Sequence, residues 1–114
     1  MIRVTYSREA LWLSVEGHAE SGPYGQDLVC AAVSALILAL GEAFRSLETE
    51  EKLEDLRQDL GRGSAYLRCE PLDPFRKEAE TALTTVTLGL RCLEKLYPRF
   101  LCCREAPHSR RLSS

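Results

Sequence analysis

The amino-acid sequence predicts an α/β (α+β) fold in a single domain, with a small antiparallel sheet packed against two main helices. The chain has 114 residues, which suits one hydrophobic core. Apolar residues alternate at period two near the N-terminus, as in strands, and recur every three or four residues in two later segments, as in helices. A content of 45% hydrophobic and 28% charged residues is typical of globular proteins.

Residues 2–6 and 11–15 are the first predicted strands. Each places its apolar side chains on one side, with Trp12 and Ser14 on the opposite side of the second strand. The connection at residues 7–9 is too short for a parallel crossover. The two strands are therefore expected to form an antiparallel hairpin.

A glycine-rich segment, GHAESGPYGQ, occupies residues 17–26 and predicts a loop. Asp27 follows it and is a favoured N-cap residue, which predicts a helix over residues 28–45. The first half of this helix is apolar nearly all round. We therefore expect it to be covered on several sides, one of them by a second copy of the chain.

Residues 48–62 permit two interpretations. The spacing of Leu53, Leu56 and Leu60 favours a helix over residues 50–59. The glycines at 61 and 63, with alternating apolar residues over 65–69, instead favour a hairpin into a strand.

Residues 75–97 carry apolar side chains at helical spacing and predict a long helix that ends before Pro98. The sequence from Cys102 onward, CCREAPHSRRLSS, shows no periodicity. We expect a domain over residues 1–101 and a flexible C-terminal tail over residues 102–114.

Charge and hydropathy exclude several classes of protein. Seventeen acidic residues against fifteen basic ones give a net charge of −2, which disfavours direct nucleic-acid binding. The longest apolar stretch, residues 28–40, is shorter than the roughly 20 residues that cross a bilayer. The N-terminus lacks the apolar region of a secretory signal. We therefore expect a cytoplasmic protein with no membrane partner.

The five cysteines and two histidines narrow the search for chemistry. No CxxC pair is present, so we expect free thiols, no structural metal site and no cofactor. The cysteines expected to pack in the core or lie in the tail are Cys69, Cys92, Cys102 and Cys103.

Cys30 and His18 are the candidate catalytic residues. Cys30 falls in the first turn of the predicted helix, where free N–H groups and the helix dipole favour the nucleophilic thiolate and an oxyanion. His18 is the one imidazole outside the tail and is the candidate base. Between them, Gly22 and Gly25 allow the loop to bend over an extended peptide.

Each of these residues also has a purely structural interpretation. A cysteine at a buried helix start is more often a packing residue, and a lone histidine is usually structural or exposed. Ser34 either faces the site or bonds back to the carbonyl four residues earlier. Tyr24 either stacks on a substrate or caps the loop, and Asp27 either caps the helix or orients His18.

The combination of GHA at 17–19 with YGQDLVCAAVSAL at 24–36 resembles the signature of the ribosomal-processing cysteine protease family, Prp. The resemblance runs from the first strand to about Phe100 and implies a strand at residues 52–59. It also implies a homodimer that uses a His–Cys dyad to remove an N-terminal extension from a large-subunit bacterial ribosomal protein during ribosome assembly. Its substrate would be the ribosomal protein precursor.

The resemblance assigns roles position by position. It makes His18 the base and Cys30 the nucleophile, with Asp27 and Ser34 at polar positions beside them. The substrate-binding loop would include Gly22, Tyr24 and Gly25. A second hypothesis, from a different class, is a noncatalytic peptide-binding ribosome-assembly factor, which needs no activated thiol. A metal site is the third.

Overall fold

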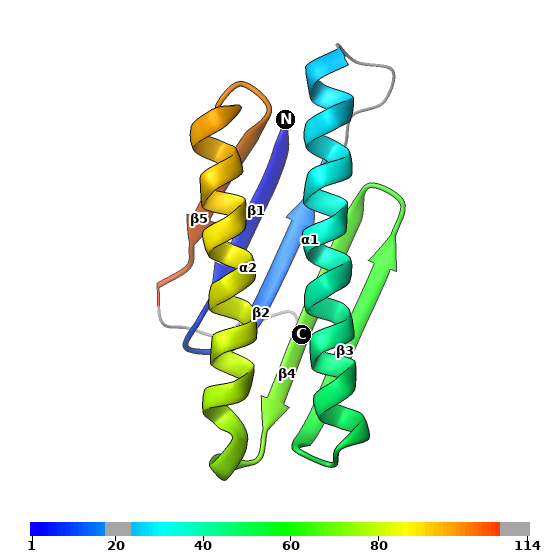
Figure 1. Ribbon diagram of the computed structural model, residues 1–114, viewed down its shortest axis with the longest axis vertical. Helices are drawn as coiled ribbons and strands as arrows, with labels where there is room; N and C mark the ends of the chain where they lie inside the picture. The colour runs from blue at the N-terminus through cyan, green and yellow to red at the C-terminus, as the bar shows by residue number, and fades with distance from the viewer. Residues whose placement is uncertain (18–23, 108–114) are drawn as a thin grey trace.

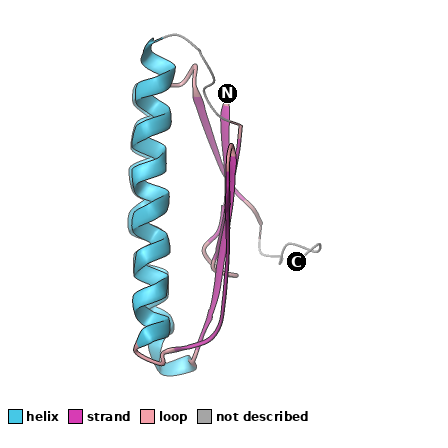
Figure 2. Cartoon of the chain, turned by 90° about the vertical axis from the view of Figure 1, so that its right-hand side faces the viewer, coloured by secondary structure: helices cyan, strands magenta, loops and turns pink. Residues whose placement is uncertain are grey.

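The computed structural model describes residues 1–17 and 24–107, with the backbone alone at residues 24–27. Its elements, in chain order, are β1 (Ile2–Ser7), β2 (Trp12–Glu16), α1 (Tyr24–Thr49), β3 (Leu53–Gly61), β4 (Ser64–Pro71), the 3₁₀ turn η1 (Asp73–Phe75), α2 (Arg76–Leu96) and β5 (Leu101–Glu105). The strands form one sheet in the order β3-β4-β2-β1-β5. Both helices lie on the same face of this sheet (Figures 1 and 2).

The α+β class, the two main helices and the first hairpin are confirmed. β1 and β2 pair antiparallel, with Val4 opposite Val15, and α2 covers nearly the whole predicted 75–97 segment. The sheet itself is mixed, because β5 pairs parallel to β1. Residues 102–105 therefore belong to an edge strand, and the expectation that they form a flexible tail is wrong; residues 108–114 lie outside the described part.

The helical interpretation of residues 50–59 is wrong, and the strand implied by the family resemblance is right. β3 pairs antiparallel with β4 along its length, with Leu56 opposite Cys69 and Leu60 opposite Ala65. A register shift lies between Leu53 and Asp55. This irregularity adds one residue to β3, so the inward-facing Leu53 and Leu56 are three positions apart, as they would be on a helix.

The core fills the space between the sheet and the two helices. α1 buries one face against the sheet, through Val29, Val33, Ile37, Leu40, Phe44 and Leu47. Its outer face remains exposed in the single chain: Leu28 is 51% and Leu38 57% exposed. The expected covering on several sides is therefore absent from the described residues of one chain. The Leu28–Thr49 part of α1 also matches a membrane-spanning helix in length and composition, a test that core helices of soluble proteins pass too.

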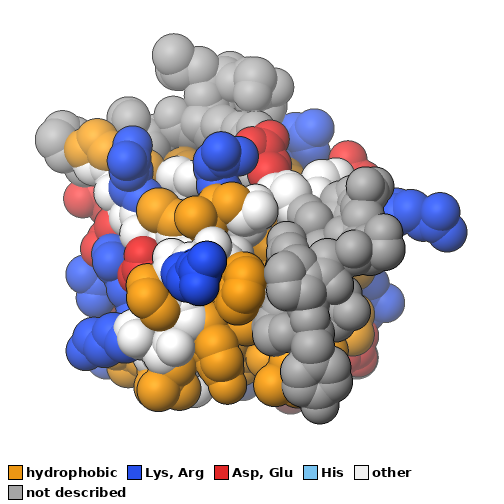
Figure 3. Space-filling model, turned by 90° about the horizontal axis from the view of Figure 1, so that it is seen from above, with side chains coloured by type: hydrophobic (Ala, Val, Ile, Leu, Met, Phe, Trp, Pro, Cys, Tyr) orange, Lys and Arg blue, Asp and Glu red, His pale blue; other side chains and the backbone are white. Residues whose placement is uncertain are grey.

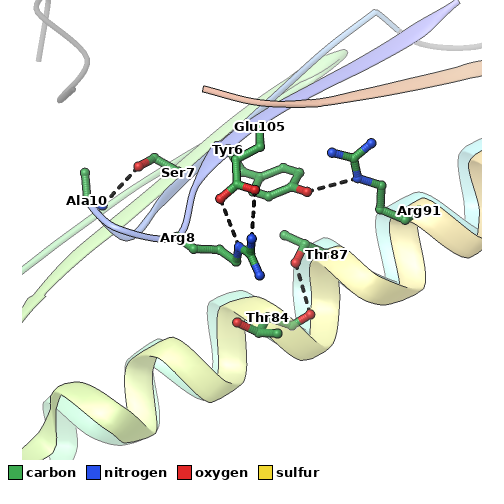
Figure 4. Close-up of polar contacts among 8 residues, drawn as sticks. All are labelled: Tyr6, Ser7, Arg8, Ala10, Thr84, Thr87, Arg91 and Glu105. Atoms are coloured by element: carbon green, nitrogen blue, oxygen red, sulfur yellow. Dashed lines mark hydrogen bonds and ion pairs between the residues drawn. The ribbon is translucent and has the colours of Figure 1, made fainter. Parts of the chain in front are cut away.

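One end of the sheet is tied together by polar contacts, and we call it the closed end. It comprises the β1–β2 turn, the start of α2 and the end of β5. The Arg8 guanidinium donates from Nε and Nη2 to the two carboxylate oxygens of Glu105, at 2.9 and 3.0 Å (Figure 4). Arg76 bonds both to Glu80 and to the backbone carbonyl of Glu9. These contacts join the turn to the neighbouring strand and helix.

Candidate active site

An apolar cleft of about 280 Å³ opens at the opposite end of the sheet, which we call the cleft end. It lies between α1 and the β3–β4 turn. The side facing the helix is formed by Cys30, Val33, Ser34, Ile37 and Leu38, and the side facing the sheet by Ile2, Val15, Gly17, Leu60, Gly61, Gly63, Ser64 and Ala65. Figure 3 looks onto this end and shows exposed hydrophobic side chains interspersed with basic ones.

Cys30 is partly buried and lines the cleft, where its thiol sits against the core cluster. It does not lie in the first turn, as the sequence predicted, because α1 begins at Tyr24. The unbonded N–H groups of a helix belong to its first four residues, and the effect of the dipole fades within the first turn. The N–H of Cys30 is therefore part of the helix ladder and is not a free oxyanion donor.

Asp27 is inside α1 and is not its N-cap, which corrects the capping expectation. The N-cap prediction was wrong because the helix extends three positions upstream of Asp27, through Tyr24, Gly25 and Gln26. Tyr24 and Gly25 are thus helical residues of the backbone, and the side chains of residues 24–27 lie outside the described part. His18 and Gly22 lie wholly outside it, so the structure leaves their predicted roles untested.

Ser34 is exposed one turn after Cys30 and lines the same cleft. The alternative was a hydroxyl bonded back to the carbonyl four residues earlier. Thr85 makes such a bond to Thr81, at 2.8 Å. No such bond is found at Ser34 within the described residues, which favours the interpretation that its hydroxyl faces the cleft.

Gly17 is a site residue whose importance sequence reasoning missed. Its φ is +85°, a conformation that favours glycine, and a Cβ there would overlap the carbonyl oxygen of Met1. Gly17 lines the cleft together with Cys30, and His18 is the next residue. The chain therefore passes from the cleft wall directly into the candidate base.

The turn between β3 and β4 was also missed as part of the site. Gly61, Gly63 and Ser64 lie across the cleft from Cys30. The two glycines indicated a hairpin in the sequence, but nothing in a single sequence shows which helix a hairpin turn will face.

The remaining cysteines have different environments. Cys69 and Cys103 are buried, as expected of packing residues, and burial raises the pKa of each thiol to about 12. Cys92 and Cys102 are exposed, so neither packs in the core. Cys30 combines partial exposure with a position in an apolar cleft. The described residues contain no group of three or more His, Cys, Asp or Glu side chains able to hold a metal.

A partly exposed thiol in an apolar cleft, beside the end of a strand, is an arrangement that a cysteine hydrolase can use. Comparison with known proteins agrees. The sequence profile of a family described as Cysteine protease Prp matches residues 1–102. The chain belongs to this family and is a cysteine protease.

Named relatives support the same assignment. The ribosomal processing cysteine protease Prp of Bacillus subtilis is 33% identical over 98 residues, covering 84% of this chain and 86% of the relative. That of Staphylococcus aureus is 32% identical over 83 residues, covering 73% and 74%. The crystal structure of the Staphylococcus aureus protease with a covalently linked product peptide matches with a TM-score of 0.71 and 26% identity, covering 93% of this chain and 100% of that one.

Proposed function

We propose that this protein is an endopeptidase that removes an N-terminal extension from a large-subunit bacterial ribosomal protein during ribosome assembly. Cys30 is its nucleophile and His18 its base. The observation that carries the proposal is the placement of Cys30 in the wall of the apolar cleft, with Gly17 leading into His18. The named relatives are ribosomal processing proteases, which supports the choice of substrate.

The reaction needs four proton transfers by one imidazole, two in acylation and two in deacylation. His18 takes the proton from Cys30 Sγ, the thiolate attacks the scissile carbonyl carbon, and a C–S bond forms. His18 then gives that proton to the leaving amine as the C–N bond breaks. A water molecule loses a proton to His18 and attacks the thioester carbonyl carbon, the C–S bond breaks, and His18 gives that proton to Sγ, which restores the thiol and the neutral imidazole. Because Cys30 lies in the second turn of α1, the imidazole contributes more to thiolate formation than the helix dipole does.

The cleft fits an extended peptide with apolar side chains near the scissile bond. Val33, Ile37 and Leu38 supply apolar surface on α1, and the glycines of the β3–β4 turn leave room for a peptide backbone. Ser34 offers a hydroxyl to this peptide. On the resemblance to the family, Asp27 and the loop residues Gly22, Tyr24 and Gly25 complete the substrate-binding residues.

The protein acts as a cytoplasmic homodimer in this proposal. The exposed apolar side chain of Leu28, which lies on α1 outside the cleft lining, supports a second protein surface against this helix. Ribosomal proteins are made in the cytoplasm, so a processing enzyme with such a substrate works there. No nucleic-acid contact is part of the proposed reaction.

The test uses the host's own candidate ribosomal protein precursor as substrate, with mass spectrometry of the products. We expect the wild-type protein to release an N-terminal peptide at one position, and Cys30→Ala and His18→Ala to release none. Cys69→Ala is the matched control, because it removes a thiol that lies outside the cleft, and it should retain cleavage.

Two results would contradict the proposal. Cleavage that persists in Cys30→Ala would remove the nucleophile from the account. A wild-type protein that binds the precursor tightly but leaves it intact would favour the peptide-binding assembly factor.

A further inference from the structure

The strand order leaves two edge strands in the sheet, β5 and β3, and side chains of α2 close the edge at β5. The Cys103 N–H of β5 donates to Glu94 Oε2 at 2.9 Å. Arg91 Nη1 lies 3.5 Å from the Cys103 carbonyl oxygen. Charged side chains thus engage the backbone groups of this edge, which hinders the addition of a further strand.

The outer edge of β3 has no such protection within the described part of the chain. The Cys69 N–H of β4 donates to the Leu11 carbonyl at 3.2 Å, so the backbone groups of Cys69 point toward β2 and away from β3. Leu56 lies opposite Cys69 in the β3–β4 register. Because successive residues of a strand face opposite sides, Leu56, Gln58 and Leu60 direct their N–H and C=O groups away from β4. Among the described residues, these backbone groups have no hydrogen-bond partner.

This open edge continues into the cleft. Leu60 and Gly61, at the end of β3, belong to the cleft wall that lies across from Cys30. Figure 1 shows β3 as the outermost strand on the side of α1, and Gln58 Nε2 joins the two elements by donating to the Gly41 carbonyl at 2.9 Å. An extended chain that leaves the cleft past Gly61 therefore meets the free backbone groups of β3.

The exposed charges of β3 favour a basic partner. Glu54, Asp55 and Asp59 are exposed carboxylates, and Arg57 is the one cation in this strand. A ribosomal protein binds RNA phosphates through basic side chains. The proposed substrate therefore complements β3 in charge as well as in its extended form.

We propose that an extended segment of the substrate adds to the sheet along the outer edge of β3 and exchanges backbone hydrogen bonds with Leu56, Gln58 and Leu60. The inference rests on the proposed function, because it assigns a path to the substrate of that same site. Backbone pairing holds the peptide whatever its side chains are, while the cleft selects the side chains next to the scissile bond.

A proline at Gln58 tests this pairing. Gln58→Pro removes one outward N–H and no hydrogen bond between β3 and β4, because Gln58 faces away from β4. Gln58→Ala is the matched control, since it removes the same side chain and its bond to Gly41 but keeps the N–H. The substrate is a peptide that spans the cleavage position of the host's ribosomal protein precursor. We expect the KM of Gln58→Pro to exceed that of Gln58→Ala about five- to tenfold, with kcat nearly unchanged.

N-methylation of the same peptide provides a second test on the wild-type protein. A methyl group replaces one backbone N–H at a time, at successive residues beyond the two that flank the cleaved bond. Because only every second residue of a strand faces its neighbour, we expect KM to rise at alternate positions on one side of that bond and to stay near the unmodified value between them. The Kd of these peptides for Cys30→Ala, measured by fluorescence anisotropy, should alternate in the same way.

These measurements separate the inference from the proposed function. A wild-type protein that leaves the peptide intact would contradict the proposed function, whereas alternation of the Kd would still support pairing with β3. Methylation effects without alternation would overturn the inference. So would equal KM values for Gln58→Pro and Gln58→Ala when circular dichroism shows both to be folded. A dimer that dissociates in Gln58→Pro but persists in Gln58→Ala, detected by light scattering, would also overturn it, because a second copy would then occupy the edge.

Discussion

The two ends of the sheet differ in the forces that shape them. The closed end is held by charged contacts, Arg8 to Glu105 and Arg76 to Glu80 and to the turn backbone. The cleft end has glycines and apolar side chains around Cys30. Each end also contains a thiol, and the sealed Cys69 contrasts with the partly exposed Cys30. One end is thus joined by polar contacts, and the other leaves the Cys30 thiol accessible.

The largest effect on stability should come from the core beside the closed end. Phe44 is fully buried in the second half of α1. We expect Phe44→Ala to lower the free energy of unfolding by about 3–5 kcal/mol. Leu38→Ala, which alters a 57% exposed cleft residue, should cost only about 0.5 kcal/mol but raise the KM for a peptide substrate. Urea unfolding measures the stability of both variants, and cleavage kinetics measure the KM of Leu38→Ala. If Phe44→Ala and Leu38→Ala lost the same stability, the contrast drawn between the two ends of the sheet would be contradicted.

The next largest expected effect on stability comes from the backbone conformation of Gly17 at the cleft end. Gly17→Ala introduces a Cβ at positive φ that overlaps the Met1 carbonyl, so we expect a loss of about 1–3 kcal/mol of stability and of most of the cleavage activity. Gly41→Ala is the control, since Gly41 lies outside the cleft and its Cβ would lie 3.4 Å from Leu67 Cδ2, an ordinary contact. Thermal unfolding and cleavage assays compare them, and a harmless Gly17→Ala would refute the role given to this glycine.

A smaller expected effect is the pH dependence of stability that comes from the buried thiols Cys69 and Cys103. Burial raises the pKa of Cys69 and Cys103 to about 12, so between about pH 9 and 12 the unfolded chain releases thiol protons that the folded one keeps. Their contribution to stability is complete below this window and is lost as the pH rises through it. We expect the Cys69→Ala protein to lose less stability than wild type between pH 8 and 10.5, measured by urea unfolding. If the free energies of unfolding of the two proteins fell equally with pH, Cys69 would not be shielded from water in the folded protein.

The smallest expected effect on stability comes from the ion pair between Arg8 and Glu105 at the closed end. The hydrogen bond from Arg8 lowers the pKa of the Glu105 carboxyl. The stabilisation is therefore present at neutral pH and is lost as the pH falls through this lowered pKa. We expect Glu105→Gln to be slightly less stable than wild type at pH 7 and equal to it at pH 2.5, because both partners are partly exposed. A difference in stability between the two proteins that persists at pH 2.5 would have to come from something other than this ion pair.

Sequence reasoning predicted the elements whose periodicity is regular. The β1–β2 hairpin and α2 follow directly from alternation and helical spacing. β3 was obscured because its register shift places Leu53 and Leu56 three positions apart. β5 was missed because it sends only two apolar side chains, Leu101 and Cys103, toward the core and its partner strand is at the other end of the sequence.

The candidate site was predicted in part. Cys30 and Ser34 do share a cleft wall, as their spacing of one helical turn predicts. The start of α1 could not be located, because Asp27 is an acceptable N-cap although the helix begins at Tyr24. The facing wall at Gly61–Ser64 depends on tertiary packing, which local patterns do not encode.

The central claim is that Cys30 is an activated thiol, and residue-resolved alkylation of the native protein tests it most directly. Iodoacetamide labelling at pH 7, followed by peptide mass spectrometry, compares Cys30 with the fully accessible thiols Cys92 and Cys102 in the same sample. We predict that Cys30 reacts fastest despite its partial burial, and that His18→Ala removes this advantage while leaving Cys92 and Cys102 unchanged. A Cys30 that reacts no faster than those two thiols in the wild-type protein would contradict the account.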